Sequence, residues 1–385
     1  MVWKKLLNID WILFFSTLPI VFAGLLTMNS FVGENYFFEK QLLWLGVSVF
    51  VFFFLSLFDF RFLKKTEVLI PLFLFFVLIL SFLFISGSVF QGAQSWFNLG
   101  FLSFQPSDFV KLTLILLLAK YFSKRHIEIA NFRHILVSGF YAFVFFVLVL
   151  LQPDFGSAII IFFIWLGMVL VSGISKKHLF VVFAVGSLAF AGLWFAPLHH
   201  LLKTEKPILQ DYQKQRILTF IHPMADIQGA GYNAYQSTIA VGSGQLLGKG
   251  VGFGTQSRLQ FLPEYQTDFI FSAFAEEWGF VGVILLFIFF SLVIWRILKI
   301  AMFGASNFEV LYGLGLVIMI ISHFIIHVGM NIGLLPVTGI TLPFMSYGGS
   351  HLLMEYMALG ILMGMRRYSR VIHREAMNNE FLGLE

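Results

Sequence analysis

The chain has 385 residues, of which 59% are hydrophobic and 12% charged, with a formal net charge of +5 and no cysteine. Soluble globular domains carry about twice this charged fraction, so the composition excludes a water-soluble protein. The lack of cysteine excludes disulfides, a thiol nucleophile and thiolate metal sites. Apolar runs of about 20 residues, enough to cross a bilayer, recur along the chain. We therefore predict an all-α polytopic membrane protein with a single integral membrane domain over residues 1–385.

Ten apolar segments follow one another along the chain. The first follows Lys4 and Lys5 and lacks a small-residue cleavage pattern, so we interpret it as a retained span and not as a signal peptide. Continuous apolar runs favour helices over the alternating strands of a barrel. The predicted transmembrane helices cover about 11–29, 41–58, 68–86, 108–122, 135–152, 155–173, 179–196, 269–299, 308–333 and 348–365.

Basic residues are distributed unevenly between these segments. The chain ends and alternate loops contain 17 of the 25 Lys and Arg residues: Lys4, Lys5, Arg61, Lys64, Lys65, Lys120, Lys124, Arg125, Arg133, Lys176, Lys177, Arg296, Lys299, Arg366, Arg367, Arg370 and Arg374. Short loops on the other side carry almost none, and basic loops stay in the cytoplasm. This pattern predicts cytoplasmic N- and C-termini and one large extracytoplasmic loop, 197–268. The positive charge is thus a topology signal, and it does not indicate nucleic-acid binding.

Two acidic residues follow short outer segments. Asp108 and Lys111 are three residues apart on the fourth apolar segment, so they share a helix face and can pair. This pair could hold two helices together, or it could be functional, because intramembrane charges are costly and often serve a function. Asp154, in "LQPDFGSA", could cap the next helix or contact a substrate.

The large loop is rich in glycine, with eight glycines between Gly229 and Gly254. Glycine lets backbone amides approach an anion closely, and Arg216, Lys249 and Arg258 supply cations near this stretch. A pyrophosphate group is one plausible ligand, and a glycine-rich turn packed on the helices is the alternative. Within the loop, Tyr235–Leu247 could form an amphipathic surface helix.

Four carboxylates lie where this loop meets the 269–299 segment: Glu264, Asp268, Glu276 and Glu277. Asp268 could cap the helix, where negative charge is favourable, or take part in chemistry. Successive helical residues point about 100° apart. We therefore expect Glu276 to face a polar cavity with Asp268, and Glu277 to bond another helix.

The ninth segment ends in "HVGMNIGLLPVTGITLPFMSYGGS", where Gly and Pro interrupt the helix. Broken helices at membrane depth are tolerated where they line a polar cavity or are buried in protein. His323 and His327 share one helix face. Without a further ligand in the pattern, they are expected to be packed or hydrogen-bonded, and a metal site is the less favoured alternative.

Several of these segments together resemble the SEDS family (shape, elongation, division and sporulation), and within it the RodA branch rather than the FtsW branch. The matching segments are "GAQSWFNLG", "FQPSDFVKL", "QPDFGSA", "DYQKQRILTF", "DIQGAGYNAYQSTIAVGSGQLLGKGVGFGTQSRLQFLPEYQTDFIFSAFAEEWGFVG" and "NIGLLPVTGITLPFMSYGGS". They occur in family order from the third apolar segment to the tenth. One residue departs from the pattern, because the family usually has Glu where this chain has Asp108.

This resemblance implies a ten-helix fold and a peptidoglycan glycosyltransferase that polymerises lipid II in the bacterial cytoplasmic (inner) membrane during cell elongation. It also implies a class B penicillin-binding protein as partner, together with the elongation machinery and membrane lipids. The family's essential acid maps to Asp268, expected to be catalytic. The expected substrate-binding residues are Lys111, Asp108, Asp154, Arg216, Lys249, Arg258, Gln236, Ser237, Glu264 and Ser346.

The expected mechanism has Asp268 as the base that deprotonates the acceptor hydroxyl, with cations stabilising the pyrophosphate leaving group. No cofactor is required by the residues, although a divalent cation, Mg or Mn, could assist. The competing class is a lipid flippase or transporter, for which spans, intramembrane acids and broken helices are also typical. The absence of a visible internal repeat and the elaborate outer loop favour the enzyme.

Overall fold

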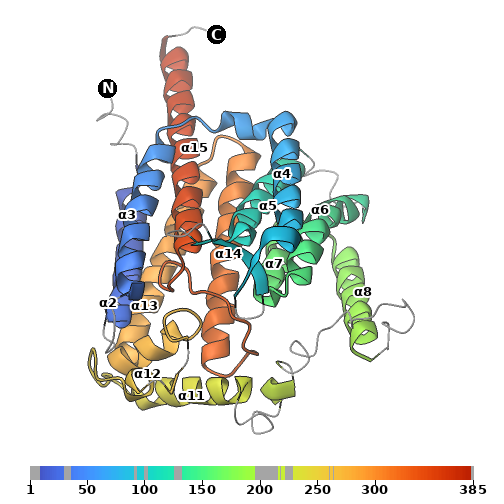
Figure 1. Ribbon diagram of the computed structural model, residues 1–385. Coiled ribbons are helices and arrows are strands. Elements are labelled where there is room, and N and C mark those ends of the chain that lie inside the picture. Colours follow the sequence, from blue (N-terminus) through green and yellow to red (C-terminus); the bar gives the residue numbers. More distant parts are fainter. Residues whose placement is uncertain are drawn as a thin grey trace.

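The computed structural model describes residues 9–29, 36–90, 93–98, 103–124, 132–195, 216, 218–221, 229–259, 261–262 and 264–382. Most of these residues form long helices that run side by side (Figure 1). Each of the predicted apolar segments falls on one of them. These helices are α2 Trp11–Asn29, α3 Tyr36–Ser56, α4 Thr66–Ser86, α5 Pro106–Ser123, α6 Phe132–Leu151, α7 Phe155–Val171, α8 Lys176–Phe195, α13 Ile270–Met302, α14 Asn307–Asn331 and α15 Gly349–Leu382.

Within the described residues, six helices are long and apolar enough to cross a membrane: α2, α3, α4, α6, α13 and α14. Their exposed surfaces are rich in large apolar side chains, such as Leu43, Leu78 and Ile85. Such surfaces are unfavourable in water and suited to lipid. The chain is therefore a multi-pass membrane protein.

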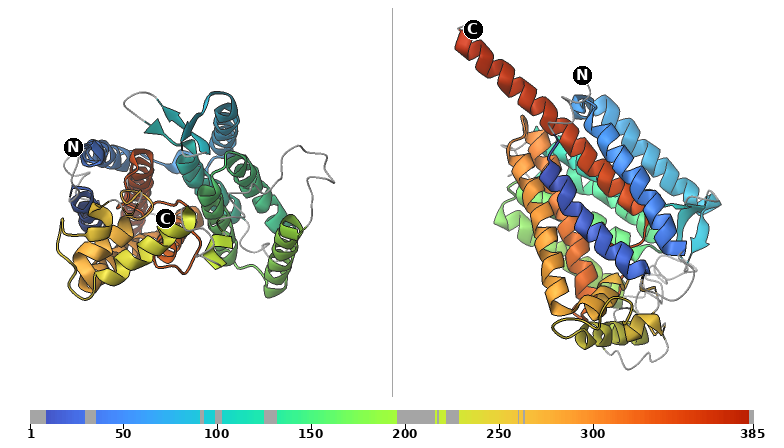
Figure 2. Two further views of the ribbon diagram at one scale, coloured as in Figure 1. Left: turned by 60° about the horizontal axis from the view of Figure 1, so that its bottom comes forward. Right: turned by 90° about the vertical axis from the view of Figure 1, so that its left-hand side faces the viewer.

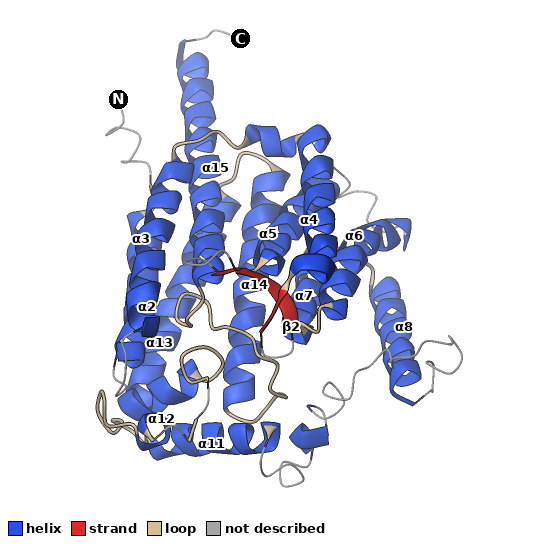
Figure 3. Cartoon of the chain, viewed as in Figure 1, coloured by secondary structure: helices blue, strands red, loops and turns tan. Residues whose placement is uncertain are grey.

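The all-α prediction is wrong for one short region. The outer loop 87–107 contributes an antiparallel three-stranded sheet of β1 Ser88–Phe90, β2 Ala93–Asn98 and β3 Ser103–Phe104 (Figure 3). Ser88 pairs with Trp96, and Phe97 pairs with Phe104. Aromatic residues favour strands, and pairing between the strands satisfies backbone groups that are outside the helices.

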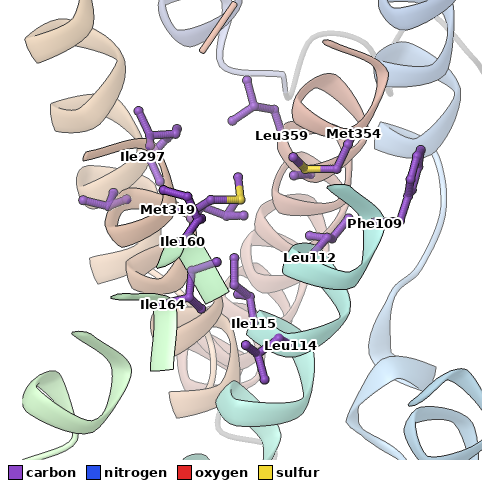
Figure 4. Packing of buried hydrophobic residues seen from close by; sticks show 14 of the residues in the cluster. Phe109, Leu112, Leu114, Ile115, Ile160, Ile164, Ile297, Met319, Met354 and Leu359 are labelled. Carbon is purple, nitrogen blue, oxygen red and sulfur yellow. The ribbon is translucent and has the colours of Figure 1, made fainter. Parts of the chain in front are cut away.

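Helix α5 occupies the centre of the bundle. Its residues from Pro106 to Ala119 are buried on every side, which is the behaviour of a helix that is surrounded by others. Figure 4 shows Leu112 and Ile115 of α5 among Ile160 of α7, Met319 of α14 and other apolar side chains. The centre of the protein is thus largely apolar, and the exceptions are buried polar and charged residues of α5, α14 and α15.

Helix α15 packs closely against α3 through small residues. A Cβ at Gly360 would lie 2.9 Å from the carbonyl oxygen of Phe52, and one at Gly364 would lie 2.8 Å from that of Phe58. Small residues four apart allow this kind of backbone approach between membrane helices. By contrast, α8 stands apart from the other helices in two views (Figures 1 and 2).

Three basic residues of the topology prediction form ion pairs at one end of the bundle. Arg296 and Arg366 both pair with Asp10, whose pKa is lowered: burial acts to raise it, but the hydrogen bond from Arg296 and the charges of both arginines outweigh this effect. Lys64 pairs with Glu309 at 2.8 Å. Helix α11, Ala230–Ser243, lies across the opposite end (Figure 1).

The part of the large loop that the structure describes after residue 228 folds against the beginning of α13. Helix α11 overlaps the predicted helix Tyr235–Leu247, and a short helix α12, Thr255–Arg258, follows it. Helix α13 is broken at Gly279, where φ is 64° and ψ is −167°. This break lets the backbone N–H of Phe280 donate to the carbonyl of Gln245 at 2.9 Å. A Cβ at Gly279 would lie 2.2 Å from the amide nitrogen of Gly248, so only glycine fits.

We predict that Gly279→Ala destabilises the protein, because its backbone conformation is essentially restricted to glycine, at a cost of roughly 1–3 kcal/mol, and the new methyl group would also clash with Gly248. Thermal unfolding of the purified protein in detergent should show a clearly lower midpoint. The matched control is Gly46→Ala in α3, where nothing lies within 4 Å of the added Cβ and Ala is the better helix former. Equal midpoints for the two variants would contradict the prediction.

Candidate active site

Asp268 lies in a tight turn just before α13. Glu264 starts this turn with φ of +48°, a left-handed conformation that is uncommon for a residue with a side chain. The Glu264 carbonyl accepts from the backbone N–H groups of Thr267 at 3.1 Å, Asp268 at 3.0 Å and Phe269 at 3.2 Å. These hydrogen bonds fix the backbone around Asp268 independently of its side chain. The carboxyl group is therefore not needed to cap the turn.

The irregular segment 332–348, between α14 and α15, packs against this turn. The Ser346 hydroxyl donates to the carbonyl of Thr267 at 2.8 Å, and the Tyr347 N–H donates to the carbonyl of Gln266 at 2.8 Å. Oδ2 of Asp268 lies 3.5 Å from where a Cβ would be placed on Gly339, which has φ of +75°. The predicted broken helix thus forms one wall of the site, and glycine at 339 keeps that wall close to the carboxylate.

Asn331, at the end of α14, holds the other side of the turn. Its Nδ2 donates to the carbonyls of Asp268 at 3.0 Å and His327 at 2.8 Å. Its Oδ1 accepts from the Ser272 hydroxyl at 2.6 Å. Ser237 of α11 completes this group, lying 2.6 Å from the Ser272 hydroxyl and donating to the Asn331 carbonyl at 2.8 Å. Of the predicted substrate residues, Ser346 thus bonds the turn directly and Ser237 bonds Asn331, which holds it.

The electrostatic surroundings of Asp268 favour its protonated form. Partial burial of the carboxyl group, with a smaller effect from the negative charge of Glu264, raises the pKa of Asp268 to about 7, against the opposing charge of Arg216 and a hydrogen bond with the Thr267 side chain. Nη1 of Arg216 donates to the carbonyl of Thr338 at 2.9 Å, next to Gly339. A carboxylate with this pKa can take and release a proton near neutral pH, and a cation lies beside it.

A second charged cluster lies within the bundle, where α5 meets α15. The predicted pair is present: Nζ of Lys111 lies 3.0 Å from Oδ1 of Asp108, and both side chains are buried. Nδ1 of His351 lies 3.1 Å from the same Asp108 oxygen. The Ser350 hydroxyl donates to Asp108 Oδ2 at 3.1 Å. The carboxylate thus has several partners, from two helices.

The sequence position of Glu276 suggested that it faces a polar cavity. In the structure it binds the glycine-rich loop instead. Its Oε1 accepts from Nζ of Lys249 at 2.6 Å and from the backbone N–H groups of Thr255 at 2.8 Å and Gln256 at 3.0 Å. Glu277 accepts from the N–H of Gly252 at 3.0 Å, so it too bonds the loop, and the expected bond to another helix stays a prediction. Three amides of this loop, those of Gly252, Thr255 and Gln256, thus bind two of the protein's own carboxylates.

The remaining predicted substrate residues lie on three different elements. Asp154 is the N-cap of α7, accepting from the Ser157 N–H at 3.0 Å, and it also accepts from Nε2 of Gln105 at 2.9 Å. Arg258 is exposed at the end of α12. Gln236 lies on α11 and is half-buried, with Oε1 lacking a hydrogen-bond partner among the described residues.

The two histidines of α14 are hydrogen-bonded to the irregular segment, as the sequence favoured. Nδ1 of His323 contacts the carbonyl of Thr341 at 3.2 Å, and Nδ1 of His327 contacts that of Ile340 at 2.6 Å. Within the described part of the chain, no group of three or more His, Cys, Asp or Glu is arranged to hold a metal ion.

Sequence reasoning missed several residues of the two clusters. Asn331 and Gly339 fall inside "NIGLLPVTG", where the helix break was recognised but no individual role was assigned. His351 and Glu355 lie on the last apolar segment, four residues apart. The spacing of His351 and Glu355 was a usable signal in the sequence, because two ionisable residues on one face of a membrane helix need partners.

Comparison with known proteins shows the family to which the chain belongs. It matches the sequence model of the FtsW/RodA/SpoVE family, described as a cell cycle protein, over residues 5–371. It is 35% identical to Stage V sporulation protein E of Bacillus subtilis over 373 residues, covering 94% of this chain and 98% of that protein. It is 36% identical to the peptidoglycan glycosyltransferase MrdB of Escherichia coli over 288 residues, covering 75% of each.

Solved structures agree with the sequence relatives. A chain of a peptidoglycan synthase complex, solved to explain how polymerization and crosslinking are coordinated, matches with a TM-score of 0.78 and 30% identity over 94% of this chain and 98% of that one. The Rod shape determining protein RodA of Thermus thermophilus matches with a TM-score of 0.67 and 27% identity over 93% and 96%. The chain therefore belongs to the FtsW/RodA/SpoVE family, the SEDS proteins, and is RodA-like in sequence and fold.

Proposed function

We propose that this protein is a peptidoglycan glycosyltransferase that polymerises lipid II during cell elongation. The printed activity of its MrdB relative supports the reaction class. The observation that carries the proposal is the Asp268 carboxyl group, set in a preformed turn with its pKa raised to about 7 and a guanidinium beside it. Sequence identity does not single out elongation, because a sporulation protein is 35% identical to this chain. The elongation role therefore rests on the likeness to the RodA structure.

In the proposed reaction, the Asp268 carboxylate takes the proton from the acceptor 4-hydroxyl as its oxygen attacks the anomeric carbon of the donor sugar. The bond between that carbon and the pyrophosphate oxygen breaks, so the configuration inverts and polyprenyl pyrophosphate leaves. The proton on Asp268 then passes to solvent. The donor already carries a good leaving group, so one base and a source of positive charge are sufficient.

Arg216 is the cation we assign to the leaving group. Among the four predicted candidates, its charge is the one felt by Asp268, whereas Lys249 is paired with Glu276 and Lys111 with Asp108. Arg258 and Lys111 would then contact more distant parts of the substrate. A divalent cation, Mg or Mn, would bind through the pyrophosphate itself, and no step of the proposed reaction depends on it.

The proposed setting is the bacterial cytoplasmic membrane, with ten membrane-spanning helices and both termini in the cytoplasm. The gathering of basic residues at the end of the bundle opposite α11 supports this orientation. We also propose a class B penicillin-binding protein as partner, together with other elongation proteins. The match to a chain of a peptidoglycan synthase complex supports this partner.

We predict that Asp268→Asn lowers lipid II polymerisation by roughly 10²- to 10⁴-fold, the usual contribution of a general base. Polymer formation should be measured in detergent with the purified protein and its partner. Because the backbone of the turn is held by Glu264 and Asn331, the thermal midpoint should stay close to that of the unchanged protein. Full activity of Asp268→Asn would contradict the assignment.

The same assay separates the enzyme from the flippase alternative. Detergent removes the two sides of a membrane, so transport cannot contribute to the signal. Polymer made by the unchanged protein and not by Asp268→Asn would identify the chain as the polymerase. No polymer from a folded, partner-bound protein would overturn the proposed function.

The pH dependence gives a further prediction. The base must be ionised, so the polymerisation rate should fall as the pH drops below about 7. Glu264 contributes to the raised pKa of Asp268 by its negative charge, and Glu264→Gln should lower that pKa, because a like charge disfavours ionisation. The acid side of the rate profile should therefore move to lower pH in Glu264→Gln. An unchanged profile would show that a different group controls the rate.

A further inference from the structure

The imidazole ring of His351 lies between two buried carboxylates. Its Nδ1 is 3.1 Å from Oδ1 of Asp108, and its Nε2 is 3.1 Å from Oε1 of Glu355. The exposed fractions are 5% for His351, 3% for Asp108 and 2% for Glu355. Both ring nitrogens therefore face an acidic oxygen in a place where water is nearly absent.

This geometry determines the protonation state of the ring. A neutral imidazole has one N–H, so one carboxylate would face a lone pair, whereas an imidazolium donates from Nδ1 to Asp108 and places its positive charge 3.1 Å from Glu355, in a contact that is not aligned as a hydrogen bond. Buried charges must also be balanced. Asp108 and Glu355 bring two negative charges and Lys111 brings one positive charge, so a protonated His351 makes the cluster neutral.

The other groups around the ring are consistent with this state. The His323 ring centroid is 4.9 Å from that of His351, and His323 Nδ1 contacts the Thr341 carbonyl at 3.2 Å. That contact needs only one N–H, so a neutral His323 satisfies it. Ser350 donates to the second oxygen of Asp108 and adds no charge.

Glu355 extends the cluster toward the active site. Its Oε2 accepts from the backbone N–H of Phe344 at 2.9 Å, and Phe344 has φ of +60°, a strained conformation for an aromatic residue. Two residues further on, Ser346 donates to the Thr267 carbonyl beside Asp268. Polar contacts thus run from Lys111 on α5 to Phe344, and the chain segment 344–346 joins them to the turn of Asp268.

We propose that His351 is a permanently protonated positioning residue, which fixes Asp108 and Lys111 for substrate and, through Glu355, fixes the segment that packs on Asp268. The expected effects on KM and kcat rest on the proposed glycosyltransferase function, whereas the protonation state of His351 does not.

The charge state is tested directly by nitrogen NMR of the full-length protein in detergent with ¹⁵N-labelled histidine. The His351 signals are assigned by their loss in His351→Gln. We expect both ring nitrogens to carry protons at pH 7.5, and Glu355→Gln to change the Nε2 signal. A His351 ring with one unprotonated nitrogen at that pH would overturn the proposal, whether or not the protein polymerises lipid II.

The positioning role is tested by steady-state kinetics with lipid II. His351→Gln should raise KM by about tenfold or more, since a 1.4 kcal/mol loss in binding corresponds to tenfold, and it should lower kcat as the Phe344 contact loosens. Glu355→Gln should act mainly on kcat. Because the residues act as one unit, the double variant should be little worse than His351→Gln alone.

His178→Gln on the peripheral helix α8 is the matched control and should leave both constants unchanged. If His351→Gln does not fold, Glu355→Gln, which keeps a similar shape, still tests the contact. Unchanged KM and kcat in folded variants would overturn the positioning role while leaving the proposed function intact. Absence of polymerisation by the unchanged protein would instead count against the proposed function alone.

Discussion

The site depends on the contact between the turn that begins at Glu264 and the irregular segment 332–348. Both are non-helical backbone next to a membrane domain, where unpaired N–H and C=O groups are costly. The two segments satisfy each other: Ser346 and Tyr347 bond to the turn, and Asn331 bonds to its Asp268 carbonyl. Because these bonds use backbone atoms of the turn, the Asp268 carboxyl group is left available for chemistry.

Burying a carboxylate is expensive unless charges or hydrogen bonds compensate, and the acids of this protein differ in how they are compensated. Glu276 is surrounded by donors from one loop, so it stabilises structure. Asp108 is compensated by Lys111, His351 and Ser350. Asp268 is less well compensated, and its pKa of about 7 is the result. Incomplete compensation is what would suit Asp268 to the proposed role of base.

The glycines of the outer loop have a composition typical of an anion-binding site, but the anions that this loop meets are side chains of the same protein. Their amides and the neighbouring Lys249 have the features of an anion site, and an anion is indeed bound there. That anion is the side chain of Glu276, with Glu277 beside it. Close approach of Gly248 to Gly279 and Gly244 to Ala275 brings the loop near enough for these bonds. The glycines therefore serve to dock the loop on α13.

Much of the architecture could be predicted from the sequence, because the length of an apolar run and the distribution of Lys and Arg depend on the bilayer and not on distant contacts. The helices were accessible in this way, and the Asp108–Lys111 pair was accessible from its spacing on one helix face. The partners of the acids were not. Glu276 and Lys249 are separated by 27 residues, Asp108 and His351 by 243, and sequence periodicity cannot show which residues meet across such distances. Only the tertiary structure decided which carboxylates are neutralised and which remains able to exchange a proton, because that depends on donors brought from other helices.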